Sequence, residues 1–314
     1  MKQQTLTGFE RHMKTTRRAQ FLADMARIVP WSEVAAVIEP VYPKVSELGG
    51  RPPIELGKML RIYFLQLWFN LSDPAAEEAL YDSVSMRAFV GIDLGEEAVP
   101  DETTICKFRH LLEKHKLGKP LLTAVNQYLH ENGVKISRGT IVDATIISGP
   151  SSTKNKDGKR DPEMHQTAKG KQWYFGMKAH IGIDSKEKLI HTILASAANV
   201  PYRDALPHLL HGRETRVWGD QGYQGRRDAI RAPRAKDFTN RRYRGLNWFN
   251  EVEKMKNRTK SQVRAKVEHA IGVIKRVFAF AKARYRGLAK NLHRLEVTAA
   301  LANLFMVRRR LLEA

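Results

Sequence analysis

Three acids are the residues of this sequence whose types and positions could perform metal-dependent chemistry. Asp143 lies within the β-branched run TIVDATII, Asp220 follows the short segment RVWG, and Glu268 lies in a run with helical periodicity. An acid inside a buried strand is costly unless a partner compensates its charge. If the three carboxylates converge, they form a hard-oxygen site that suits a divalent cation such as Mg²⁺ or Mn²⁺.

The chemistry of such a site is phosphodiester cleavage and transfer. Two ions about 3.5–4 Å apart activate an attacking water or 3′-hydroxyl and stabilise the leaving oxygen. We therefore expect Asp143, Asp220 and Glu268 to be both catalytic residues and metal ligands. Each also has a plainer interpretation: Asp143 could cap a turn, Asp220 could end a strand before a glycine, and Glu268 could form a weak surface ion pair four residues from Arg264.

Basic side chains accompany these acids along the chain. Arg264 and Lys275 fall on the same helical line as Glu268, which predicts that they contact phosphates; the alternative is a solvated helix face. Lys178 is a further candidate phosphate contact in a predicted strand. His180 points to the same side of that strand, and a core histidine held by a hydrogen bond is the favoured interpretation there.

A basic and aromatic segment lies between the second and third acids. Its charged and aromatic members are Arg241, Arg242, Tyr243, Arg244 and Trp248. This interleaving favours neutralisation of a DNA backbone combined with base stacking. Ordinary core packing of the Trp248-Phe249 pair is an equally good interpretation.

Helical patterns dominate the first part of the chain, which predicts a helical N-terminal domain over residues 1–132. Asp101 suits the N-cap of one helix, and Asp73 suits that of another running from Pro74 to Val90. We expect this domain to mediate dimerisation and to contact DNA through one helix. The pattern leaves open whether its last helices form a helix-turn-helix.

The second part, residues 133–314, predicts three strands, a helix, a fourth strand and a long closing helix. That order is typical of a ribonuclease-H-like catalytic domain, an α+β or α/β arrangement with a mixed sheet flanked by helices. Residues 151–172 are polar and are expected to form a loop, and 226–260 form a basic segment. The expected strands are 140–147, 173–183, 189–195 and 216–219, and the expected helices are 203–210, 261–285 and 291–312.

The formal net charge of +21 is unevenly distributed. Residues 1–130 contain equal numbers of basic and acidic residues, so the whole excess falls on 131–314. Such an excess favours a polyanionic partner, of which nucleic acid is the simplest. A membrane surface is disfavoured because the basic residues are spread through the fold. Cys106 is the only cysteine, which excludes internal disulfides and cysteine-based zinc sites and suits the reducing cytoplasm.

In order along the chain, several motifs resemble those of the DDE transposases of bacterial insertion sequences, in the group that spans the insertion-sequence-four and insertion-sequence-five families. Ser261 stands where the family signature normally has a tyrosine, so that tyrosine's role is not carried over. The short gap between Asp220 and Glu268 favours the insertion-sequence-five side, because it leaves little room for a large β insertion. The motifs are Pro100-Asp101-x-Thr103-Thr104-x₃-Phe108-Arg109, Trp173-Tyr174-Phe175-Gly176-x-Lys178-x-His180, Ala197-Ala198-Asn199-Val200, Gly219-Asp220-x-Gly222-Tyr223 and Arg264-x₃-Glu268-x₆-Lys275.

The resemblance implies a DNA transposase with two Mg²⁺ or Mn²⁺ ions per active site. It would bind the terminal inverted repeats of its element, cut the 3′ strands and join them to target double-stranded DNA. It would act as a homodimer in the bacterial cytoplasm, associated with the nucleoid. Two alternatives remain: a nuclease of the same fold that cuts without joining, and a domesticated DNA-binding regulator without catalysis. The intact set of acids argues against the regulator.

Overall fold

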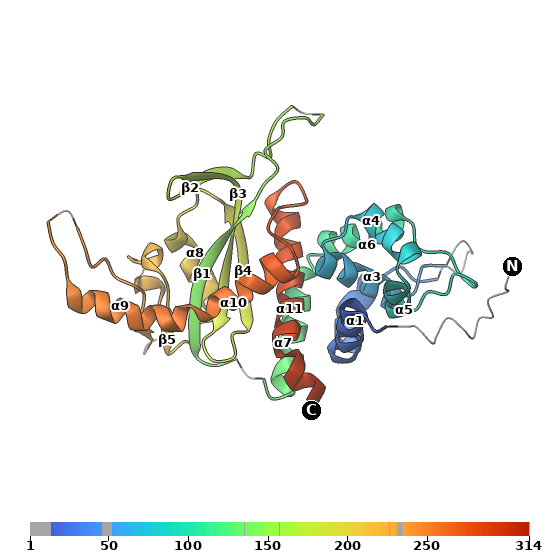
Figure 1. Cartoon of the computed structure of the whole chain (residues 1–314), viewed down its shortest axis with the longest axis horizontal. Coiled ribbons are helices and arrows are strands. Elements are labelled where there is room, and N and C mark those ends of the chain that lie inside the picture. Colours follow the sequence, from blue (N-terminus) through green and yellow to red (C-terminus); the bar gives the residue numbers. More distant parts are fainter. Residues whose placement is uncertain are drawn as a thin grey trace.

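The protein is described by a computed structural model that covers residues 14–45, 52–134, 136–156, 158–225, 227–230, 235–245 and 247–313. Figure 1 shows a helical part on one side of the long helix α11 and a twisted sheet with helix α9 on the other. The helical part consists of α1 (Arg17–Ile28), α2 (Trp31–Ile38), the 3₁₀ turn Glu39–Val41, α3 (Leu56–Phe69), α4 (Asp73–Asp82), α5 (Val84–Val90), α6 (Glu102–Lys114) and α7 (Gly118–Glu131).

The sheet part begins after α7 and ends with α11. Its strands are β1 (Gly139–Ser148), β2 (His165–Lys169), β3 (Gln172–Asp184), β4 (Ile190–Ala197), β5 (Arg216–Trp218) and β6 (Lys236–Asp237). Its helices are α8 (Tyr202–Leu209), α9 (Glu251–Arg264), α10 (Lys266–Gly272) and α11 (Leu288–Glu313), with 3₁₀ turns at Gln221–Tyr223 and Arg227–Ala229 and a π-helix at Val273–Val277.

Side-chain caps fix the starts of α4, α5 and α6. Asp101 caps α6 as predicted, because its carboxylate accepts a hydrogen bond from the Thr104 amide at 2.7 Å. The prediction for Asp73 was wrong by one residue: the hydroxyl of Ser72 caps α4, and Asp73 lies in its first turn. The expected single helix from Pro74 to Val90 is two helices, since Ser83 has extended backbone angles and caps α5.

The strand order in the sheet is β2-β3-β1-β5-β6, and β4 pairs with β3 outside this path. Residues 177–183 of β3 pair antiparallel with both β1 and β4, so those two strands lie on opposite edges of β3. β5 runs parallel to β1 and is reached through α8. Strands β1, β3 and β4 are antiparallel and are followed by α8. Strands β5 and β6 then add in parallel on the other edge of β1. This arrangement is a ribonuclease-H-like fold, as the sequence predicts.

The expected loop over 151–172 contains a strand that the sequence did not indicate. β2 pairs with the first residues of β3 through a turn at Gly170, whose φ of 63° lies in the left-handed region that glycine favours. The side chains of β2 are mostly exposed on both faces, so no apolar alternation marks it in the sequence.

The predicted helix over 261–285 is interrupted, and it both begins and ends earlier than expected. α9 begins ten residues earlier, Ala265 separates it from α10, and a π-helix follows at Val273–Val277. The helical run ends before Ala279, whose φ is 53°, because the next residue, Phe280, is fully buried in the core. A π-helix inside a helical run often marks a functional site.

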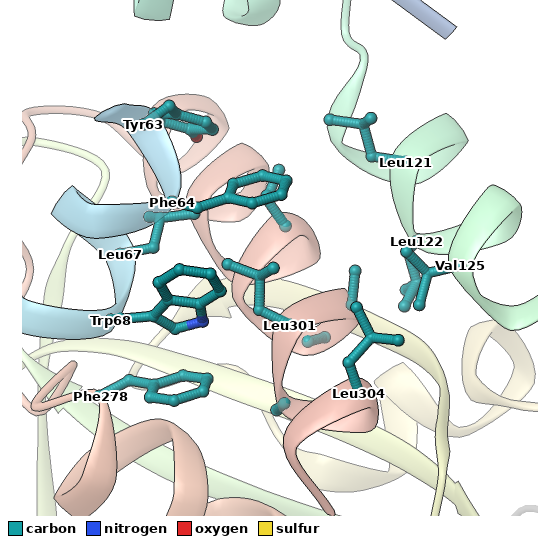
Figure 2. Packing of buried hydrophobic residues seen from close by; sticks show 14 of the residues in the cluster. Tyr63, Phe64, Leu67, Trp68, Leu121, Leu122, Val125, Phe278, Leu301 and Leu304 are labelled. Carbon is teal, nitrogen blue, oxygen red and sulfur yellow. The ribbon is translucent and has the colours of Figure 1, made fainter. Parts of the chain in front are cut away.

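Helix α11 joins the two parts through one continuous buried core. Leu301 and Leu304 lie between Trp68 of α3 and Leu122 of α7, as Figure 2 shows. On the sheet side, the Asn303 side chain accepts a hydrogen bond from the Ile190 amide at 2.8 Å and donates one to its carbonyl at 2.7 Å. α11 therefore holds the edge strand β4 in place and fixes the sheet against the helical part.

Among the described residues, no helix is long and apolar enough to cross a membrane.

Candidate active site

The parallel pairing of β1 with β5 brings Asp143 and Asp220 together. Gly139 pairs with Arg216 and Ile141 with Trp218. The same offset, continued for two residues, sets Asp143 beside Asp220 at the carboxyl end of β5. Side chains of equivalent residues on neighbouring parallel strands point to the same face of a sheet, so both carboxylates lie on one face.

A tight turn fixes Asp220. Its carboxylate accepts a hydrogen bond from the Gly222 amide at 2.8 Å and caps the 3₁₀ turn Gln221–Tyr223. Gly222 is required there, because a Cβ atom would lie 2.8 Å from the Tyr202 ring. Burial raises the pKa of Asp220, and the negative charge of Asp143 raises it further. The two carboxylates therefore repel each other inside a partly desolvated site.

Arg264 compensates the charge of Asp143. The Asp143 side chain accepts a hydrogen bond from Nη2 of Arg264 at 3.1 Å and one from the Ala144 amide at 2.8 Å. Asp143 is only 8% exposed, and Arg264 reaches it from the last turn of α9. The Nε atom of Arg264 is buried and has no hydrogen-bond partner among the described residues. The guanidinium thus binds a carboxylate oxygen of Asp143 that a metal cation could otherwise bind.

Two tyrosines that the sequence analysis did not assign to the site line it. The rings of Tyr202 and Tyr223 lie 5.7 Å apart, and burial raises both pKa values, with further increases from the charges of Asp143 and Asp220. The Tyr223 hydroxyl is buried without a partner among the described residues. Tyr223 belongs to the Gly219–Tyr223 motif and could have been proposed from it, whereas no sequence signal marks Tyr202.

Lys178 and His180 point inward from β3. Nζ of Lys178 donates a hydrogen bond to the Val200 carbonyl at 2.7 Å and lies 4.4 Å from the centre of the Tyr202 ring, and burial lowers its pKa. His180 is fully buried, bonds with the Ser196 hydroxyl at 2.8 Å, and has a pKa lowered to about 4 by burial and by Lys178. Lys178 therefore supports the wall of the site and is not free in solvent.

Glu268 and Lys275 lie further along the same helical run. Lys275 donates hydrogen bonds to the Thr145 hydroxyl at 3.3 Å and to the Ile146 carbonyl at 2.9 Å, and so attaches the π-helix to β1. Glu268 is exposed on α10. No group of three His, Cys, Asp or Glu side chains within the described ranges is arranged to hold a metal ion. The structure thus brings together two of the three acids.

The donor set at this pair fits a divalent cation. Carboxylate oxygens are the ligands that Mg²⁺ and Mn²⁺ prefer, and a cation would relieve the repulsion that raises the pKa of Asp220. A cation must compete with Arg264 for Asp143.

A cavity of about 740 Å³ opens beside Asp220. It is lined along α9 by Glu251, Arg258 and Arg264, and across from the helix by Asn240 and Arg241. Cations outnumber acids on its wall, as expected for a site that accepts a phosphate backbone.

The basic and aromatic segment forms a loop at the rim of this cavity. The Asn250 amide bonds to the Tyr243 carbonyl at 2.7 Å, and Arg241, Arg242 and Arg244 are exposed. Trp248 is 50% exposed and Phe249 58% exposed, which excludes the core-packing interpretation of this pair. Arg226, residues 231–234 and Leu246 of the expected basic segment lie outside the described residues.

Two family models match most of the chain. Residues 135–304, more than half of the chain, match the family model described as transposase DDE domain, and residues 10–111 match the model described as transposase domain (DUF772). The chain is also similar to a solved piggyBac transposase in a synaptic complex with hairpin DNA. That similarity has 10% identity and a TM-score of 0.47, and it covers 95% of this chain and 77% of the other.

Proposed function

The chain belongs to the DDE transposase family and is a metal-dependent DNA transposase, and we propose that Asp143, Asp220 and Glu268 form its catalytic centre. The observation that carries this assignment is the register of β1 and β5, which sets Asp143 and Asp220 side by side next to a cavity rich in arginine. We assign the three acids as ligands of two Mg²⁺ or Mn²⁺ ions. When bound, such ions supply an activated oxygen nucleophile and stabilise the leaving oxygen of a phosphodiester.

The proposed role of Glu268 requires a movement of α10. This seven-residue helix lies between the break at Ala265 and the π-helix. We propose that the helix rotates at these irregularities without unfolding α9, because the hydrogen-bond pattern changes at both. The Glu268 amide bonds three residues back to Ala265, and the Phe278 amide bonds five residues back to Val273. Release of Arg264 from Asp143 would accompany this movement. Arg264 would then bind a DNA phosphate in place of the carboxylate.

DNA binding is assigned to the rim of the cavity. Arg241, Arg242 and Arg244 would neutralise backbone phosphates, while Tyr243 and the exposed Trp248 stack on bases near a strand end. We assign Lys275 and Lys178 a positioning role in the walls of the site. Lys275 attaches the π-helix to β1, and Lys178 packs on the Tyr202 ring.

The reaction we propose has two steps on double-stranded DNA. The enzyme binds the terminal inverted repeats of its element, hydrolyses the 3′ strands and transfers the freed 3′-hydroxyls to target DNA. Two ends require two active sites, so we propose a homodimer in which residues 1–132 supply the subunit contacts and residues 133–314 the chemistry.

The test is an Asp143→Ala variant compared with Asp93→Ala, which removes an exposed aspartate from the helical part. Asp143→Ala should bind end DNA within a few-fold of the unmodified protein but make no cut in Mg²⁺, whereas Asp93→Ala should cut normally. Retained cleavage by Asp143→Ala would refute the assignment of the site.

A strand-transfer assay separates the alternatives. Pre-cut element ends and a plasmid target should give joined products with this enzyme. A nuclease of the same fold would cut ends but join nothing, and a non-catalytic regulator would bind ends tightly without any metal-dependent product.

A further inference from the structure

A second basic surface lies on α10 and the end of α11, away from the cavity beside Asp220. A hollow of about 490 Å³ is bordered by the turn between β3 and β4, by α10 and by the last turns of α11. We call it the polybasic hollow. Its positive charge comes from Lys186, Lys188, Arg308, Arg309 and Arg310, and His269 also lines it.

Positive charge in the polybasic hollow is poorly compensated. Among the described residues that line it, Glu187 is the single acid, and it lies 3.5 Å from Arg310. Like charges held this close destabilise the unliganded protein. A polyanion that neutralises them would bind with a gain in free energy.

The polybasic hollow and Glu268 lie on different faces of α10. His269 follows Glu268 directly, so their side chains lie about 100° apart around α10. Lys266 donates a hydrogen bond from Nζ to the Ser185 carbonyl, which attaches this second face of α10 to the β3–β4 turn. Figure 1 shows α9 extending from α10 away from α11, whereas the C-terminal end of α11 lies on the other side.

We propose that the polybasic hollow binds the backbone of the target DNA duplex. The argument rests on the proposed function. In an in-line displacement at phosphorus, the attacking and leaving oxygens lie on opposite sides of the reacting group. The DNA that carries the 3′-hydroxyl and the DNA that is attacked must therefore reach the acids from two directions. The cavity beside Asp220 accepts the element end, and the hollow beyond α10 holds the target.

The experiment neutralises two exposed cations of the hollow whose side chains form no hydrogen bond or ion pair with the described part of the chain. The variant is Lys186→Gln with Arg309→Gln, and the matched control is Arg27→Gln with Lys44→Gln, two exposed cations of the helical part. Both double variants lower the net positive charge by the same amount. End binding, 3′-strand cleavage and transfer of pre-cut ends into a plasmid are measured for each.

We expect the hollow variant to bind and cut ends within about twofold of the control and to transfer strands about tenfold more slowly, because loss of a phosphate contact weakens binding regardless of sequence. For duplex without element ends, the slope of log affinity against log salt should fall by about 0.9 for each lost contact.

Three results would overturn the proposal: equal transfer by variant and control, an unchanged salt slope, or a loss of end binding as large as the loss of transfer. The last result would place the element end itself in the hollow. If the unmodified protein cuts no ends, the proposed function fails, while the salt slope still tests whether the hollow binds duplex.

Discussion

Replacement of Arg264 by methionine tests the electrostatic balance of the site. The change removes the guanidinium that compensates Asp143 and leaves a side chain of similar length. Asp143 then faces Asp220 without a counter-charge in a partly desolvated pocket. We expect the folded state to lose stability in a metal chelator and to gain more from a divalent cation than the unmodified protein does.

The magnitude follows from the burial of the ion pair. The side chain of Asp143 is 12% exposed and that of Arg264 21% exposed, so the pair is largely desolvated. Removing one partner of a fully buried pair costs about 3–5 kcal/mol, and the residual exposure of Arg264 reduces this to about 2–3 kcal/mol. For a chain of this size, that loss lowers Tm by about 4–6 °C.

Differential scanning calorimetry in chelator and in Mn²⁺ measures both effects. At about 100 times its dissociation constant, a bound ion adds about 2.7 kcal/mol, so Mn²⁺ should restore most of the lost Tm in Arg264→Met. The matched control is Arg258→Met, an exposed arginine of the same helix. The reasoning is refuted if Arg264→Met and the unmodified protein have the same Tm in chelator, or if Mn²⁺ raises the Tm of these two proteins equally.

Three further changes have defined outcomes. Because the pKa of Asp220 is raised, this side chain stays protonated to higher pH in the folded state than in the unfolded state. Protonated Asp220 therefore stabilises the fold at low pH, and this contribution is lost as pH rises through the folded pKa. Asp143→Asn should lower that pKa, and NMR titration of Asp220 with an unmoved midpoint would contradict this. Gly222→Ala should cost about 1–3 kcal/mol in urea unfolding, because its Cβ would lie 2.8 Å from Tyr202; an unchanged midpoint would contradict the clash. Trp248→Ala should weaken end-DNA binding by about 1–3 kcal/mol in fluorescence anisotropy while leaving Tm unchanged, since the side chain is half exposed; a lowered Tm would indicate a packing role.

Local sequence signals were sufficient for the core of the fold. The β-branched run around Asp143 predicted β1, and the alternation of apolar segments and turns predicted β3, β4 and β5 in their observed order. Capping chemistry placed the start of α6 at Asp101. These features depend on nearest neighbours along the chain, which the sequence displays directly.

Features set by tertiary contacts could not be read in the same way. β2 is exposed on both faces and has no apolar alternation. The break at Ala265 and the π-helix depend on how the chain packs on β1 through Arg264 and Lys275, which periodicity alone does not contain. The pairing of Asp143 with Asp220 depends on the register of β1 and β5, which is set by tertiary structure. For Lys178, the sequence indicated a charged strand residue but could not show that it turns inward.

The most direct test of the central claim is metal-dependent cleavage by Glu268→Gln. The control is Glu78→Gln, an exposed acid of α4. If Glu268 completes the metal site with the two aspartates, Glu268→Gln should bind element ends normally and lose at least about a hundredfold in cleavage rate in Mg²⁺, while Glu78→Gln cuts like the unmodified enzyme. Cleavage by Glu268→Gln at the control rate would contradict the three-carboxylate site.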